Sequence, residues 1–253
     1  MVVLIVSFFI TAILYATVGL GGGSTYGALL VLAETDYHIL PTIALICNII
    51  VASGGAYRFL RAGHINARLI LPLVFTSIPA AWLGGYIHVS ESWFSGLLGF
   101  SLLVAGGRML WQRSASQNIF VGTKVQPFLL APAIGAGLGF LSGIVGIGGG
   151  IFLAPVLHLL RWDNAKKIAA TCSVFILTNS LAGLSGQVMK LHDTELLDNI
   201  GVYGWLFPAV LVGGQIGSYM GAKYLNPNTL RFLTALLILY VSGRLLLRWW
   251  GMI

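Results

Sequence analysis

Hydrophobic positions along the chain fall into runs of about membrane-spanning length. The eight long runs are 2–18, 39–60, 69–89, 92–110, 127–147, 168–188, 200–222 and 230–247. Each is close to the roughly 20 residues that a helix needs to cross the hydrocarbon core of a bilayer. Two shorter runs, 24–33 and 151–160, would rise about 15 Å as helices, which is half of that core. The pattern predicts an all-α, polytopic integral membrane protein.

Each short run follows a glycine cluster, and the two clusters match. Residues 18–23 have the sequence VGLGGG, and residues 145–150, 127 positions later, have the sequence VGIGGG. Because glycine inside a helix costs roughly 1 kcal/mol relative to alanine, three together predict a helix break. In a bilayer, such a break is tolerated only where protein, water or a ligand satisfies the freed backbone groups.

Further matches extend this likeness between the two halves of the chain. At offsets of 125 to 136 positions, the paired residues are Ile43 with Ile168, Cys47 with Cys172, Pro72 with Pro208, Ser77 with Gly213, Ala81 with Gly217, and Gly85 with Gly221. We therefore predict a duplicated unit, with a first repeat at 1–110, a polar connecting loop at 111–126 and a second repeat at 127–253.

Corresponding loops of the two repeats carry opposite charge. Loop 34–38 has two acidic residues, whereas its partner 161–167 has three basic residues against one acidic residue. Loop 58–68 has three arginines, whereas its partner 189–199 has three acidic residues and one lysine. Since cytoplasmic loops are enriched in Lys and Arg, equivalent loops should face opposite sides of the membrane.

The same rule selects a topology. If 2–33 and 127–160 each form a re-entrant hairpin, the 14 Lys and Arg residues divide into 11 inside and 3 outside. If each is instead a kinked crossing, the division is 9 and 5. We therefore predict two inverted repeats, each a glycine-broken re-entrant hairpin followed by three transmembrane helices. This plan is typical of secondary transporters.

Composition excludes several other classes of protein. The 253 residues are 57% hydrophobic and 8% charged, with a mean hydropathy of +0.91, whereas a soluble domain has about 25% charged residues. The net charge of +7 is spread over loops, without a nucleic-acid motif. No Walker-type loop, HExxH or GxSxG motif occurs, and no carboxylate pair lies deep in a span, so ATP hydrolysis and enzymatic catalysis are not indicated.

The glycine breaks are the candidate binding site. A helix start exposes unpaired N–H groups and about half a positive charge, and glycine leaves those N–H groups accessible and permits positive φ. Two such starts brought together would form a cradle for an anion. The predicted substrate-binding residues are Gly21, Gly22, Gly23, Ser24 and Thr25 at the first break, Gly148, Gly149, Gly150 and Ile151 at the second, and Cys47, Asn48, Cys172, Ser173 and Asn179 on the helices that follow.

Other interpretations of these residues stay open. Glycines also allow neighbouring helices to cross closely in lipid, which is what we expect of Gly135, Gly139 and Gly143. Cys47 and Cys172 either line an anion pocket or act as small buried fillers. Asn179 either forms a hydrogen bond between helices or donates into the pocket.

The sequence resembles the TauE/SafE family of membrane proteins, also called the sulfite exporter or TSUP family. The likeness lies in GLGGGSTYGALLVL at 19–32, GIGGGIFLAPVLHLL at 146–160 and GHINARLILPLVFTSIPAAWLGGYI at 63–87. It implies a multi-pass carrier of the bacterial or archaeal inner membrane for sulfur-containing anions such as sulfite or sulfonates. One departure is that Gly27 and Ala28 stand where the second repeat has Ala154 and Pro155.

We therefore expect a secondary transporter of small sulfur-containing anions, and the resemblance implies an exporter. We expect membrane lipid and a small anion as partners, no nucleic acid, no cofactor and no metal site. A proton or sodium ion is the expected coupling ion, and a homodimer is a candidate assembly. Two alternatives remain. One is a carrier of another small anion, such as a carboxylate. The other is a membrane enzyme or a subunit of a larger complex.

Overall fold

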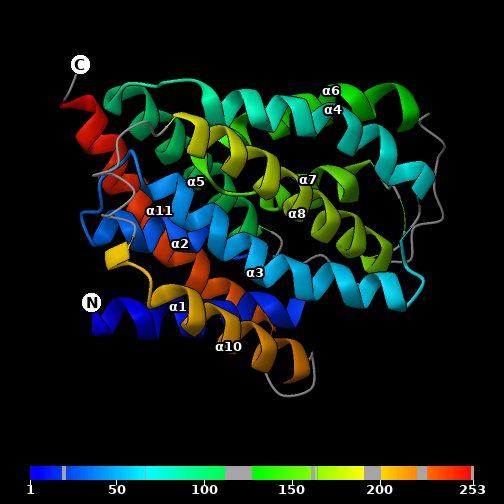
Figure 1. Ribbon diagram of the computed structural model, residues 1–253, viewed down its shortest axis with the longest axis horizontal. Coiled ribbons are helices and arrows are strands. Elements are labelled where there is room, and N and C mark those ends of the chain that lie inside the picture. Colours follow the sequence, from blue (N-terminus) through cyan, green and yellow to red (C-terminus); the bar gives the residue numbers. More distant parts are fainter. Residues whose placement is uncertain are drawn as a thin grey trace.

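The structure is a computed structural model that describes residues 1–18, 21–65, 67–111, 127–160, 163, 165–190, 201–220 and 227–251 (Figure 1). These residues are helical and include no strand. The helices are α1 (Val2–Val18), α2 (Gly23–Leu32), α3 (Leu40–Arg61), α4 (Ala67–Tyr86), α5 (Glu91–Trp111), α6 (Pro127–Val145), α7 (Gly150–Leu159), α8 (Ala165–Lys190), α10 (Leu206–Met220) and α11 (Pro227–Trp250). Residues 112–126 of the predicted connecting loop and residues 191–199 lie outside the described residues.

The all-α architecture predicted from the hydrophobic pattern is confirmed. Each predicted run coincides with a helix, and the two short helices begin at Gly23 and Gly150, one residue before their predicted starts. In Figure 1, α1 runs inward from the end of the molecule that carries the N-terminus, and α2 returns toward that end. Helices α6 and α7 make the same excursion from the opposite end. With 10 residues each, α2 and α7 are too short to cross a bilayer.

Helix packing follows a regular scheme. Helix α1 packs on α10 and α6 packs on α4, while α3 lies against α8 and α5 against α11. The short helices continue the scheme, since α2 contacts α3 and α11 while α7 contacts α8 and α5. These contacts are those expected if α1 to α5 correspond to α6, α7, α8, α10 and α11 in that order.

Glycines bring several of these helices into close contact. A Cβ added to Gly135, Gly139 or Gly143 of α6 would collide with the backbone carbonyl of Leu73, Ser77 or Ala81 of α4, respectively. Glycines of α10 meet the backbone of α1 in the same manner. This confirms the predicted role of the three α6 glycines, because only a residue without a side chain permits such a crossing.

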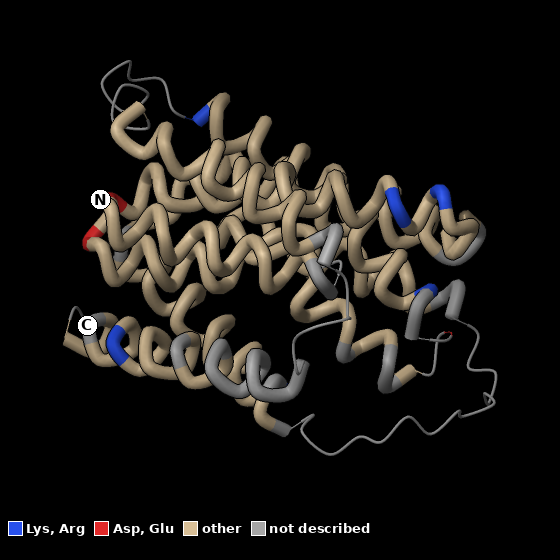
Figure 2. The backbone as a smooth tube through the Cα atoms, turned by 90° about the horizontal axis from the view of Figure 1, so that it is seen from below, with Lys and Arg blue, Asp and Glu red and all other residues tan. Residues whose placement is uncertain are grey.

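The outer surface is rich in large apolar side chains. Phe75, Trp205 and Trp250 are each more than 70% exposed, which would be unusual for a soluble monomer because exposed apolar patches there are small. The described charged residues lie at or near helix ends and in connections, so the middle of the bundle is free of described charge (Figure 2). Two described stretches, Leu40–Arg61 and Lys167–Lys190, are long and apolar enough to span a membrane. The surface therefore matches a lipid environment.

The crossing of α4 and α6 predicts opposite effects for two similar substitutions. Gly137→Ala meets no atom within 4 Å, so the higher helix propensity of alanine should stabilise the protein by up to about 1 kcal/mol. Gly139→Ala places its Cβ 2.5 Å from the Ser77 carbonyl oxygen and should destabilise the protein by about 1–3 kcal/mol through overpacking. Thermal unfolding in detergent measures both effects. Equal melting temperatures for the two variants would contradict the described crossing.

Candidate functional site

The two glycine breaks meet around the side chain of Asn48 on α3. A Cβ added to Gly21 would lie 2.5 Å from Asn48 Oδ1, and one added to Gly148 would lie 2.9 Å from Asn48 Nδ2. A Cβ on Gly23 would also collide with Asn48 Nδ2. One buried amide therefore contacts glycines from two segments that are more than 120 positions apart in the sequence.

The breaks also touch one another directly. A Cβ on Gly23, the first residue of α2, would collide with the carbonyl oxygen of Ile147 in the second break. Glycine is therefore required at Gly23 by the close approach of another backbone. At the second break, the φ angles of Gly146, Gly148 and Gly149 are 75°, 79° and 74°, a region that favours glycine. The described glycines of the first break do not adopt positive φ, so the two breaks differ in backbone conformation.

Helix α8 supplies the third side of the site. Ile176 Cγ2 would lie 3.1 Å from a Cβ on either Gly21 or Gly148, and Ser180 Oγ would lie 3.1 Å from a Cβ on Gly148. Neither residue is among those predicted from the sequence. A helical projection could have identified both, because they follow the predicted Ser173 by three and seven positions and share one face of α8 with it.

The helix starts at this site have backbone donors without a partner in their own helix. In α2 the first hydrogen bonds are donated by the N–H groups of Thr25 and Tyr26 to the Gly22 carbonyl, at 3.0 and 2.9 Å. Helix α7 begins the same way, with bonds donated to the Gly149 carbonyl. The N–H groups of the first two residues of each helix precede these bonds and have no acceptor within their own helix. Both starts therefore contribute donors and positive helix-dipole ends.

Several buried polar side chains lack a hydrogen-bond partner among the described residues. Both amide atoms of Asn48 are buried without a partner, as are the amide atoms of Asn179 and the hydroxyls of Ser142 and Ser180. The described structure therefore gives Asn179 no hydrogen bond between helices. An unsatisfied buried polar group costs about 1–3 kcal/mol. Asn48 and Ser180 carry such a cost at the junction of the breaks.

The other predicted residues at the breaks occupy different surroundings. A Cβ on Gly22 would face Tyr26 and Thr11, and one on Gly149 would face Phe175, so neither would point at Asn48. Ser24 and Thr25 are buried, and the Thr25 hydroxyl bonds the Tyr15 hydroxyl at 2.8 Å. Ile151 is half-buried and packs on the larger apolar core cluster.

The predicted residues after each hairpin also differ from one another. Cys47 and Cys172 are fully buried within the two apolar core clusters, surroundings that suit a small apolar filler. The Ser173 hydroxyl donates to the Ala169 carbonyl of its own helix at 3.0 Å. Among the five predicted residues of α3 and α8, Asn48 is therefore the one that contacts both breaks.

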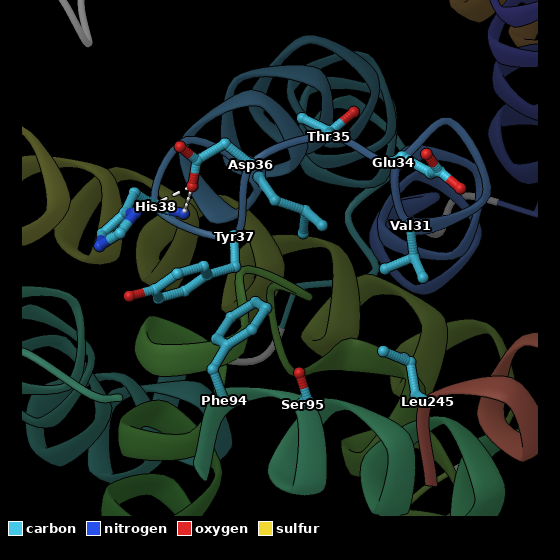
Figure 3. Close-up of a pocket in the computed structure, with 10 residues that line it drawn as sticks. Val31, Glu34, Thr35, Asp36, Tyr37, His38, Phe94, Ser95 and Leu245 are labelled. Carbon is cyan, nitrogen blue, oxygen red and sulfur yellow. Dashed lines mark hydrogen bonds and ion pairs between the residues drawn. The ribbon is translucent and has the colours of Figure 1, made fainter. Parts of the chain in front are cut away.

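A cavity of about 610 Å³ lies apart from the breaks, at the connection between α2 and α3 (Figure 3). Its lining includes Glu34, Asp36 and His38, and the His38 Nδ1 atom lies 2.8 Å from Asp36 Oδ1. Among the described residues, no group of three or more His, Cys, Asp or Glu side chains could hold a metal ion. The sequence pattern did not predict this cavity.

Comparison with known proteins identifies the family. The family described as "Sulfite exporter TauE/SafE" matches residues 3–245. A "Probable membrane transporter protein y4hK" of Sinorhizobium fredii is 36% identical over 247 residues, which cover 96% of this chain and 97% of that protein. The "Probable membrane transporter protein YunE" of Bacillus subtilis is 22% identical, with 94% of each chain covered. No solved structure is a significant match. The chain belongs to the TauE/SafE sulfite exporter family and is a membrane transporter, not an enzyme.

Proposed function

We propose that the protein is a secondary transporter that exports small sulfur-containing anions, such as sulfite or organosulfonates, across the bacterial or archaeal inner membrane. The anion binds between the two glycine breaks. The observation that carries this proposal is the buried, unpartnered Asn48 amide in contact with Gly21, Gly23 and Gly148. The family name supports the sulfur anion and the direction of transport.

The chemistry of the site supports an anion as the substrate. The starts of α2 and α7 supply backbone N–H donors and the positive ends of two helix dipoles. The Asn48 amide and the Ser180 hydroxyl can add donors from α3 and α8. Described acidic residues lie at the helix ends and in connections, so none opposes a negative charge at the breaks. A sulfite or sulfonate group has three oxygens that can accept hydrogen bonds from several directions.

The size of the site supports a small substrate. A Cβ added to Gly21 or Gly148 would lie within 3.1 Å of atoms of both Asn48 and Ile176, so neither glycine leaves room for a side chain. The breaks are therefore closed around Asn48 and Ile176 in this conformation. A binding site of this kind opens by moving the hairpins apart by a small amount. A compact anion fits such a site better than a bulky organic one.

Alternating access follows from the arrangement of the hairpins. The matched helix contacts support the proposed duplication of 1–110 in 127–253, and the opposite directions of the two hairpins in Figure 1 support their inversion. In such a scaffold, exchange of conformation between the repeats exposes the central site first to one side and then to the other. We propose a proton or sodium gradient as the driving force and a homodimer as the assembly.

Replacing the Asn48 amide should separate transport from stability. Asn48→Leu removes two unpartnered polar atoms from a buried position, so the melting temperature in detergent should stay the same or rise. Uptake of labelled sulfite into proteoliposomes should fall at least about tenfold, because a hydrogen bond to a charged group is lost.

Thr42→Val is the matched control for Asn48→Leu. Thr42 lies on the same helix, is buried, and also has an unpartnered hydroxyl. We expect the same effect on stability and transport within about twofold of wild type, a margin well below the loss of a charged hydrogen bond. If Asn48→Leu transports sulfite at the wild-type rate, the proposed site is wrong. If the wild type prefers carboxylates to sulfite, the proposed substrate is wrong.

The contact between Gly21 and Asn48 should appear as energetic coupling. Gly21→Ala should destabilise the protein by about 1–3 kcal/mol because its Cβ overlaps Asn48 Oδ1. In an Asn48→Ala background the overlap disappears, so the two substitutions should couple by more than about 1 kcal/mol. Unfolding in detergent measures each free energy. Gly54→Ala, which meets no atom within 4 Å, should be additive with Asn48→Ala; additivity at Gly21 as well would refute the contact.

A further inference from the structure

A second cavity, of about 260 Å³, has a basic lining. It lies where the start of α3, the α4–α5 connection and the end of α8 come together, and its lining includes His38, His88, Ser90 and Lys190. Sequence analysis assigned no role to these four residues. An ammonium group and two imidazoles around one small cavity form a group of donors suited to an anion.

Two lining residues connect this cavity to the second glycine break. Pro41 and Ile144 line it, and Pro41 packs against the break, since a Cβ on Gly146 would lie 2.6 Å from Pro41 Cα. Gly146 is two residues before Gly148, which contacts Asn48 and Ser180. The cavity is therefore adjacent to the proposed binding site on the side from which α3 begins.

A buried hydrogen bond joins α8 to α6 next to this cavity. Gln187 Nε2 donates to the Gly143 carbonyl at 3.0 Å, and its Oε1 has no partner among the described residues. Gly143 immediately precedes Ile144, which lines the cavity. Lys190, which also lines the cavity, lies three residues after Gln187 on α8. Ser180 lies seven residues before Gln187, so the two side chains share one face of that helix. This face links Lys190 to the glycine breaks through polar side chains.

The charges around the cavity favour an anion. Lys190 is half-buried and has no ion pair with a carboxylate among the described residues. The nearby Asp36 carboxylate already accepts from the His38 backbone N–H at 2.9 Å and lies 2.8 Å from His38 Nδ1. Tyr37 and His38 line both cavities, and Figure 3 shows their side chains directed away from Glu34, which lines only the larger one.

We infer that the cavity lined by His38, His88 and Lys190 is a docking site for the transported oxyanion, where the anion waits before or after passage to the glycine breaks. The identity of the anion rests on the proposed function, whereas the attraction of anions to the cavity does not. Because this cavity has low-dielectric walls around a positive charge, it raises the local concentration of anions.

Thiol labelling tests the docking site without requiring transport. In the Ser90→Cys variant, the labelling rate of each methanethiosulfonate reagent is divided by its rate with a small free thiol in solution. On this scale, the reagent that carries a sulfonate should react about fivefold faster than its trimethylammonium counterpart, because the cavity concentrates anions. Adding Lys190→Gln should abolish this preference. Adding Arg244→Gln, which removes an exposed charge outside the cavity lining, should leave the preference intact. The parent protein, whose two cysteines are buried, gives the background rate.

Transport of labelled sulfite by Lys190→Gln in proteoliposomes completes the test. We expect a KM raised about fivefold with kcat within twofold, because a docking site raises the local concentration of anion and leaves the translocation step unchanged. Equal labelling rates for the two reagents in Ser90→Cys, after division by their rates with a free thiol, overturn the docking site, even if wild type transports sulfite. Anion-selective labelling of Ser90→Cys, together with no sulfite transport by the wild type, supports the docking site and overturns the proposed substrate instead.

Discussion

The structure depends on a single constraint, which is that backbone groups freed inside a bilayer must find partners within the protein. Each glycine break separates two helices and leaves N–H and carbonyl groups without partners in their own helix, and lipid offers none. The fold shields both breaks by placing them against each other, so that Gly23 at the start of α2 packs against the Ile147 carbonyl. Neither break could be buried in this way without the other.

Close approach of backbones makes this arrangement possible, and glycine makes the close approach possible. Helix α4 is held between α6 and α8 by contacts in which Gly84 meets the Phe140 carbonyl of α6 and Gly85 meets the Gly183 carbonyl of α8. In lipid there is little hydrophobic force between helices, so packing of this density carries the association. The same dense packing holds α3 and α8 beside the breaks. It also keeps the Asn48 amide buried, where neither of its polar atoms has a hydrogen-bond partner among the described residues.

Much of the fold could be predicted from the sequence, and less of the site. Helix positions followed from the length of apolar runs, because a bilayer of fixed thickness imposes a fixed length. The importance of both glycine clusters followed from their repetition. Which neighbours face them followed only in part, because a helical projection places Ile176 and Ser180 on the same face of α8 as the predicted Ser173, but their approach to Gly148 depends on how that helix is rotated. Whether Gly22 and Gly149 face Asn48 could not be predicted either, since consecutive glycines face different directions and the sequence does not tell which direction faces the site.

The site is less symmetric than the scaffold around it. The position of Asn48 on α3 corresponds to Ser173 on α8, yet the Ser173 hydroxyl donates to its own helix while the Asn48 amide contacts both breaks. The first break has a serine and a threonine after its glycines, whereas the second has isoleucine and phenylalanine, and only the second uses positive φ among the described glycines. The polar side chains that face Gly148 are therefore not a symmetric pair, since they are the Asn48 amide of α3 and the Ser180 hydroxyl of α8. In the proposed transporter, duplication would supply the two related conformations that alternating access needs, while divergence of the two halves would supply a defined orientation for the substrate.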